Sequence, residues 1–99
     1  MSVTVLLKAV AKDTTGVETS LRVIGSREPP GKMSIQVSVT GAASVRIQAK
    51  IAREAPWVDV GPAYSASALA YIEPVQFLRA VTSGMDASSV VTVWAVWAW

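Results

Sequence analysis

The residues that could do chemistry in this chain form a limited set, because its 99 residues include no histidine and no cysteine. Without them there is no Ser-His or Cys-His couple, no thiolate metal site and no disulfide framework. A serine–lysine pair is the remaining nucleophilic arrangement, but the serines fall in turns or on polar strand faces. The sequence therefore gives little support to nucleophilic catalysis.

Carboxylates are the other candidate catalytic groups, and they are spread along the chain. They are Asp13, Glu18, Glu28, Glu54, Asp59, Glu73 and Asp86. Glycoside hydrolysis needs two such groups about 5–10 Å apart, and a tight turn would bring Glu54 and Asp59 close together. Loop acids beside a proline are more commonly solvated, and no Asp-rich calcium loop occurs. We therefore expect a non-enzymatic protein with no cofactor and no metal.

Basic side chains offer a different kind of binding. Arg46, Lys50 and Arg53 form a basic stripe that, beside an exposed aromatic ring, would suit single-stranded nucleic acid. The net charge of +2 is small for that purpose. Such residues are more common as solvated strand positions that discourage unwanted pairing, so nucleic acid is not the favoured partner.

Aromatic residues in the middle of the chain suggest a further alternative. Trp57, Tyr64 and Tyr71 would together suit a platform for stacking sugars. A tryptophan in a β-sandwich is more commonly part of the core, so we expect Trp57 to be buried between two sheets. Tyr64 lies in the small-residue stretch 61–67 and is the better candidate for contact with a neighbouring molecule.

Strands must position these residues, because period-two alternation dominates the sequence. The clearest case is the pair of runs at 33–40 and 45–51, joined by the short Gly-containing loop 41–44. We expect these runs to form a β-hairpin with one wet face and one buried face. The predicted inward residues are Met33, Ile35, Val37, Val39, Val45, Ile47, Ala49 and Ile51.

The other expected strands are short and separated by turn signals every 8–12 residues, and they cover 3–11, 17–24, 57–60, 69–72, 75–82 and 88–99. This pattern predicts one all-β domain over 1–99, an antiparallel β-sandwich of about seven or eight strands. Its topology is either jelly-roll or immunoglobulin-like. Phe77 and Val81 share an apolar row and are expected in the core. Arg79, on the same row, is then either paired or reoriented by a bulge.

The C-terminal strand 88–99 holds three of the four tryptophans and is apolar on both side-chain rows. Twelve residues are too few for a membrane-spanning helix, which needs about 20. Charged residues make up only 16% of the chain, against about 25% in typical domains, so we expect an assembly to cover part of the surface. Trp94 is expected inside the sandwich, while Trp97 and Trp99, on the opposite row, contact a neighbour.

The stretch from about 41 to 94 resembles a recurrent pattern in small tailed-bacteriophage virion proteins. In that pattern a Gly turn and an alternating strand precede a tryptophan strand, a proline, an aromatic-Leu/Val-Arg-Ala strand, a second Gly turn and a Thr/Val-rich strand. The matching residues are Gly41, Val-Arg-Ile-Gln at 45–48, Trp-Val-Asp-Val at 57–60, Pro74, Phe-Leu-Arg-Ala at 77–80, Ser-Gly at 83–84 and Ser-Val-Val-Thr-Val at 89–93. The chain departs from the pattern at 54–56, where Glu-Ala-Pro replaces an Asp-Gly turn, and in the Trp-rich extension past Val93.

The resemblance implies a structural role, since many proteins of this kind are head decoration or cement proteins. It implies a homo-oligomer on the capsid surface of a virion, bound to the major capsid protein and assembled in the bacterial host cytoplasm. No membrane partner is expected. A tail, neck or fibre subunit is an alternative, and so is a module that binds carbohydrate or single-stranded nucleic acid. The expected contact residues are Trp97, Trp99, Trp94, Tyr64, Arg27 and Lys32.

Overall fold

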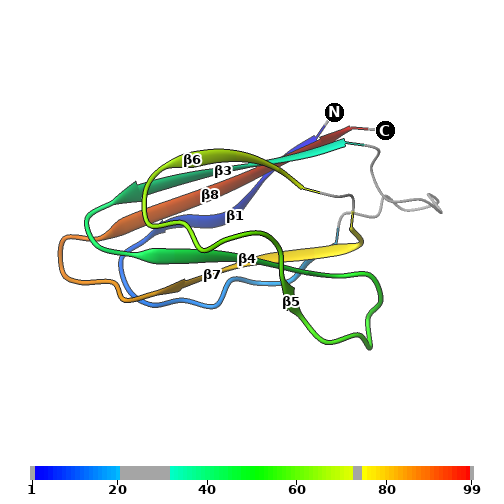
Figure 1. The fold of residues 1–99 in the computed structure, drawn as a ribbon, viewed down its shortest axis with the longest axis horizontal. Coiled ribbons are helices and arrows are strands. Elements are labelled where there is room, and N and C mark those ends of the chain that lie inside the picture. Colours follow the sequence, from blue (N-terminus) through cyan, green and yellow to red (C-terminus); the bar gives the residue numbers. More distant parts are fainter. Residues whose placement is uncertain (1, 21–31, 73–74, 99) are drawn as a thin grey trace.

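The computed structural model describes residues 2–20, 32–72 and 75–98, and every regular element in these ranges is a strand (Figure 1). The strands are β1 (Ser2–Val10), β2 (Thr19–Ser20), β3 (Lys32–Thr40), β4 (Ser44–Lys50), β5 (Val58–Asp59), β6 (Ala68–Ile72), β7 (Phe77–Ser83) and β8 (Val90–Ala98). They form two four-stranded antiparallel sheets, ordered β1-β8-β3-β6 and β2-β7-β4-β5. The predicted all-β sandwich is confirmed.

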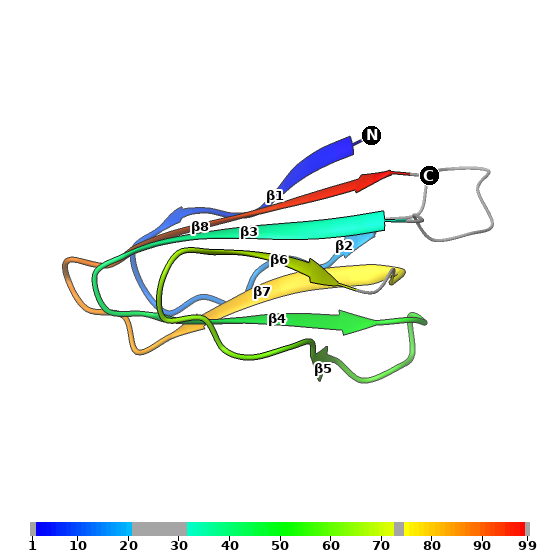
Figure 2. The same cartoon turned by 45° about the horizontal axis from the view of Figure 1, so that its top comes forward.

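The strand pairings define which kind of sandwich this is. Strand β1 pairs with β8, β2 with β7, β3 with β6 and β4 with β5, so two halves of the chain run side by side as one long ribbon. The ribbon is folded over so that β8 also pairs with β3, and β7 with β4. This arrangement is a jelly roll, which selects one of the two predicted topologies. Figure 2 shows β1, β8, β3 and β6 as one layer and β7 and β4 in the other.

The hairpin predicted for 33–51 is wrong, because β3 and β4 belong to different sheets. Both strands form where the alternation indicates, and their apolar rows both point into the sandwich. Alternation determines which side of a strand is buried, but it does not determine which strand lies beside it. The connection at 41–43, where Gly41 has a φ of +77°, therefore crosses between the sheets.

The core lies between the two sheets and is built from the inward rows of the long strands. Its buried apolar residues are Leu6, Leu7, Met33, Ile35, Val37, Val45, Ile47, Ala49, Leu78, Ala80, Val91, Val93 and Ala95. Leu6 and Leu7 are consecutive yet both buried, because the pairing of β1 with β8 shifts register on either side of Leu7. Such a bulge turns neighbouring side chains toward the same face. The predicted inward position of Ile51 is wrong, because Ile51 follows the end of β4 and is 74% exposed.

The row of β7 that points into the core also differs from the prediction. Phe77 and Val81, expected in the core, lie with Arg79 on the outer face of the sheet. The residues that point inward are Leu78, Ala80 and Thr82. Burying an unpaired guanidinium costs far more than leaving one valine partly exposed, so the charge of Arg79 is the reason that this row faces water.

Strand β8 is likewise reversed relative to the prediction. Val91 and Val93 are fully buried, whereas Trp94 lies on the opposite row and is only half-buried. The predicted internal position of Trp94 is therefore wrong. Pairing with β3 determines this orientation, because Val91 and Val93 lie opposite Val39 and Val37 on the inward row of β3.

A matched pair of isoleucines tests this assignment of the core. Ile47→Ala is expected to lower the free energy of unfolding by about 2–5 kcal/mol, since Ile47 is 1% exposed and its removal leaves a cavity. Ile51→Ala makes the same chemical change at an exposed position and is expected to stay within about 0.5 kcal/mol of wild type. Urea denaturation of the three proteins measures both values. Equal losses in the two variants would contradict the described end of β4.

Candidate functional site

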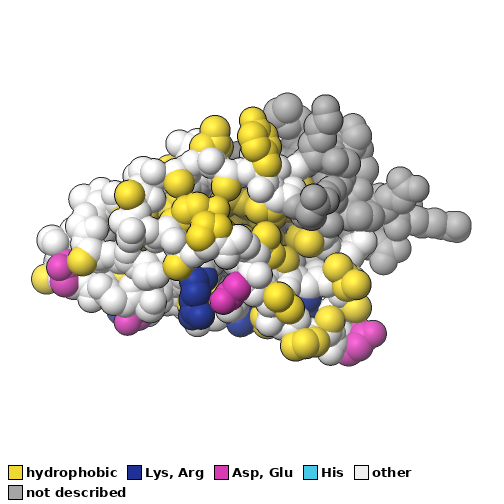
Figure 3. Space-filling view, in the orientation of Figure 1, with side chains coloured by type: hydrophobic (Ala, Val, Ile, Leu, Met, Phe, Trp, Pro, Cys, Tyr) yellow, Lys and Arg dark blue, Asp and Glu magenta, His cyan; other side chains and the backbone are white. Residues whose placement is uncertain are grey.

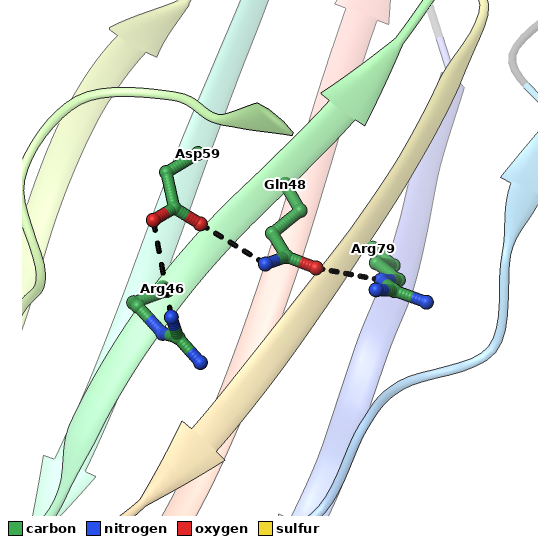
Figure 4. Close-up of polar contacts among 4 residues, drawn as sticks. All are labelled: Arg46, Gln48, Asp59 and Arg79. Carbon is green, nitrogen blue, oxygen red and sulfur yellow. Dashed lines mark hydrogen bonds and ion pairs between the residues drawn. The ribbon is translucent and has the colours of Figure 1, made fainter. Parts of the chain in front are cut away.

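The outer face of the β2-β7-β4-β5 sheet carries a continuous polar ladder (Figure 4). Gln48 lies opposite Arg79 on one side and Asp59 on the other. The Nε group of Arg79 donates to Gln48 Oε1 at 2.8 Å, and Gln48 Nε2 donates to Asp59 Oδ1 at 3.0 Å. Arg46 Nη1 completes the ladder, 3.9 Å from Asp59 Oδ2. The alternation of β4 and β7 brings these polar side chains to one face.

Trp57 extends this ladder at the surface, so the prediction that it is buried between the sheets is wrong. The guanidinium carbon of Arg79 lies 4.4 Å from the centroid of its ring, and Lys50 Nζ lies 4.8 Å from it. Lys50 Nζ is also 2.9 Å from Glu18 Oε1 and donates to the carbonyl of Arg53 at 2.9 Å. The negative face of the indole attracts both cations, which holds the three side chains together.

These contacts weaken the two ligand-binding alternatives for this face. Arg46 and Lys50, two residues of the predicted basic stripe, each have a carboxylate partner within the chain. The ring of Trp57 is in contact with cations rather than open for a base or a sugar. A phosphate or a stacked ligand would have to displace these internal partners first. Most of the polar and charged groups named on this face therefore already have hydrogen-bond or ion-pair partners within the chain.

The outer face of the β1-β8-β3-β6 sheet has a different character. One cross-strand row runs from Val5 through Trp94 and Gln36 to Leu69, each residue opposite the next. The neighbouring row contains Val96, Ser34 and Tyr71. Neither row carries a charged side chain. Leu69 is 66% exposed and Tyr71 is 84% exposed, and Figure 3 shows hydrophobic side chains gathered over β6.

Trp94 forms one wall of a shallow hollow in this face, with a volume of about 350 Å³. The hollow is lined by Ser34, Gln36, Leu69, Trp94, Ala95 and Val96. It lies over β3, where the smaller polar side chains of Ser34 and Gln36 run between the larger ones of β8 and β6. Exposed apolar surface of this kind marks sites of contact with other molecules. This Trp94 face, defined by its two cross-strand rows, is the candidate functional site.

Leu69 and Tyr71 are members of this site that sequence reasoning did not assign to a contact surface, apart from the sugar-platform alternative for Tyr71. The signal is present in β6, where alanines at 68 and 70 alternate with larger side chains at 69 and 71. The small residues occupy the side that faces the opposite sheet, because they pair with the buried row of β3. The large ones must then point outward.

The remaining predicted contact residues are distributed differently. Tyr64 is half-buried against the core and exchanges two backbone hydrogen bonds of 2.8 Å with Val45. Lys32 and Trp97 lie at the same end of the β3–β8 pair. Arg27 and Trp99 lie outside the described residues. The structure brings Lys32 and Trp97 together, while Tyr64 lies elsewhere, on the β4 side of the sandwich.

A serine–carboxylate cluster lies in the turn between β7 and β8. Asp86 Oδ1 accepts hydrogen bonds from the hydroxyl of Ser88 at 2.7 Å and from its backbone N–H at 2.9 Å, and Ser89 Oγ lies 3.0 Å away. These bonds, that from the Ser88 hydroxyl foremost, lower the pKa of Asp86 below its ordinary value of 3.8. The hydroxyl of the buried Ser89 also bonds the carbonyl of Ala42. The cluster therefore fastens this turn to the β3–β4 connection.

Other kinds of site find little support in the described part of the chain. Residues 2–20, 32–72 and 75–98 contain no group of three or more acidic side chains placed to hold a metal ion. The same residues include no helix of the length and hydropathy that a membrane crossing requires.

Comparison with known proteins finds no family model that matches the sequence, no curated protein that matches it and no solved structure that matches the fold. No relative therefore supplies a role for any residue of either face. The assignment of the candidate site depends on the geometry of this chain.

The Asp86 cluster leads to a pH-dependent prediction. Asp86→Asn is expected to lower the free energy of unfolding at neutral pH, because a neutral acceptor replaces the carboxylate. The folded-state pKa of Asp86 is depressed, so its contribution is present above 3.8 and is lost as the pH falls through the lower folded-state value. Urea denaturation across this acidic range measures the effect.

Glu54→Gln is the matched control, since it neutralises an exposed carboxylate outside the cluster. It is expected to leave the stability close to that of wild type at every pH. A stability difference between Asp86→Asn and wild type that persists unchanged in acid would contradict the role given to the carboxylate.

Proposed function

We propose that this chain is a non-enzymatic structural protein of a tailed-phage virion, which decorates and stabilises the capsid through protein–protein contacts. The observation that carries the proposal is the uncharged, apolar Trp94 face on one side of the sandwich. The resemblance over residues 41–94 indicates the kind of particle. The jelly roll is also an architecture used by viral capsid proteins, which is consistent with this assignment.

The Trp94 face has the properties of a docking surface. Tryptophan is among the residues that contribute most to binding energy at protein interfaces. Trp94 is half-buried between Val5 and Gln36, so part of the entropy of fixing its ring is already lost before binding. No charge in its two rows would have to be desolvated on docking. Binding would therefore depend on contact area rather than on chemistry.

The proposed partner is the major capsid protein. A standard interface buries about 800 Å² on each partner. Repetition of the contact over a symmetric shell adds avidity without any new contact. Under this proposal the protein lies on the capsid surface as a homo-oligomer and assembles in the cytoplasm of the bacterial host.

Electron microscopy of virions assembled with and without this chain tests the location. Added density on the outer shell, repeated with the symmetry of the capsid, is the expected result. Density confined to the tail, the neck or a single vertex would contradict decoration and would favour the alternative tail or fibre subunit. An unchanged particle would overturn a structural role in the virion.

Trp94→Lys tests the surface itself. The variant places a charge in the middle of the apolar row, so docking would have to desolvate an ammonium group. Binding to capsids made from the major capsid protein is expected to weaken by about 30-fold or more, measured by co-sedimentation. Val17→Lys, at an 81% exposed position away from this face, is the matched control and is expected to bind normally. Normal binding by Trp94→Lys would contradict the proposed face.

Trp97 and Trp99 stay predicted contact residues. A substitution tests them better than a truncation of the chain does. The backbone of Trp97 pairs with both Ser2 and Met33 inside the sheet. Removal of residues 97–99 would therefore break strand pairing as well as any contact with a partner. Replacement of an indole by alanine leaves the backbone pairing in place, but Trp97 shares its row of β8 with the buried Val91 and Val93, so its variant needs a stability measurement beside the binding assay.

A further inference from the structure

Strand β6 forms one edge of the β1-β8-β3-β6 sheet, and the directions of its backbone groups follow from a neighbouring contact. The hydroxyl of Ser67 bonds both the N–H of Val39, at 3.0 Å, and its carbonyl, at 3.5 Å. Both groups of Val39 therefore point toward β6. In an antiparallel ladder these directions alternate along a strand, so Val37, Ile35 and Met33 also point toward β6 and bond its residues 68, 70 and 72.

The remaining residues of β6 present their backbone groups to the outside. Leu69 and Tyr71 alternate with the residues that bond β3, so their N–H and C=O groups point away from the sheet. No backbone partner for these groups occurs among the described residues. Among the side chains of this sheet that the structure describes, those of Leu69 and Tyr71 are the most exposed large apolar groups.

Among the described residues, the other three sheet edges carry features that hinder further pairing, whereas β6 carries none. Strand β1 shifts register twice along its pairing with β8 and has a positive φ of 47° at Ala9. Strands β2 and β5 are two residues long, and β5 carries Asp59. Short strands, bulges and charges are the usual means of preventing edge-to-edge pairing. Strand β6 has an unbroken register with β3 and the uncharged sequence Ala-Leu-Ala-Tyr-Ile.

We propose that β6 pairs with the β6 strand of a second copy of this chain, antiparallel and about a two-fold axis at Ala70. In this register Leu69 lies opposite Tyr71 of the second copy, and Tyr71 opposite its Leu69. Each pair exchanges both of its outward-pointing N–H···O bonds. The two sheets then become one continuous sheet across the axis. This inference does not depend on the virion role.

The β6 edge is self-complementary, so a second copy of this chain fits it. Antiparallel pairing uses the outward backbone groups of Leu69 and Tyr71 in both copies at once. It also places a leucine against a tyrosine on the outer face twice, a favourable cross-strand combination. Ala70 falls on the axis at a non-hydrogen-bonded pair, where the Cα atoms approach to about 4.5 Å and a small side chain is needed. No like charges meet, because β6 has none.

A cysteine at the axis gives a direct test, because the chain contains no cysteine of its own. In Ala70→Cys the new thiols would lie within the Cα separation of about 4.4–6.8 Å that a disulfide requires. Mild oxidation of the folded variant is expected to give a disulfide-linked dimer on a non-reducing gel. Val90→Cys, in the same sheet but at its other end, is the matched control and is expected to stay unlinked.

Sedimentation equilibrium of the full chain tests the same contact without a cross-link. Wild type is expected to dimerise, and Leu69→Pro to raise the dimer dissociation constant about 10-fold or more, since it removes one donor from each copy. The proline leaves the β3–β6 ladder intact, because the N–H of Leu69 points outward. Tyr71→Lys removes the apolar contact instead and serves if Leu69→Pro does not fold. Val90→Lys is expected to dimerise as wild type does.

Two results would overturn the proposal. One is a wild-type chain that stays monomeric at high concentration. The other is a dimer that neither Tyr71→Lys nor Leu69→Pro weakens and that the Ala70→Cys substitution does not cross-link. Neither result bears on the binding of capsids through Trp94, which Trp94→Lys tests separately.

Discussion

The unbroken pairing of β3 with β8 is the constraint on which the rest of the structure depends. Nine consecutive residues of each strand are paired, from Lys32 with Ala98 to Thr40 with Val90. This ladder converts the long ribbon into a roll, and its register determines what each face presents. It puts Val91 and Val93 beside the buried row of β3, and it puts Trp94 beside Gln36 on the outside. A slip by one residue would exchange the two rows of β8.

Which row of β8 points into the core could not be predicted from its own residues, because both of its rows are apolar. The orientation of β8 follows from that of β3. Strand β3 has only one orientation that avoids burying the polar side chains of Ser34 and Gln36. Pairing transmits that orientation to β8. The same reasoning explains β7. The charge of Arg79 predicts correctly that its row faces water, whereas Phe77 and Val81 on the same row favour the core. Strand positions were therefore largely predictable from local alternation, while pairing and facing required long-range register.

The two outer faces show why the candidate site was only partly visible in the sequence. On one face, Gln48 joins Arg79 to Asp59, and these residues come from three different strands. The hydrogen bonds among them form only once the fold brings the three strands together, so no local sequence pattern predicts them. On the other face, Trp94 lies beside residues of β1, β3 and β6 through the same kind of cross-strand alignment. Composition alone predicts that an assembly covers part of the surface, and it does not single out either face.

In β6 the packing of the core determines which side chains are exposed at the edge of the sheet. Its alanines at 68 and 70 lie opposite Val37 and Ile35, which are buried in the core, so the alanines are on the row that faces the opposite sheet. Overfilling such a core is itself destabilising. The larger residues of β6 are therefore placed on the outer row, and the sheet edge exposes a leucine and a tyrosine that folding does not need to bury. The packing requirement of the interior thus produces the apolar edge through which the sheet can be extended.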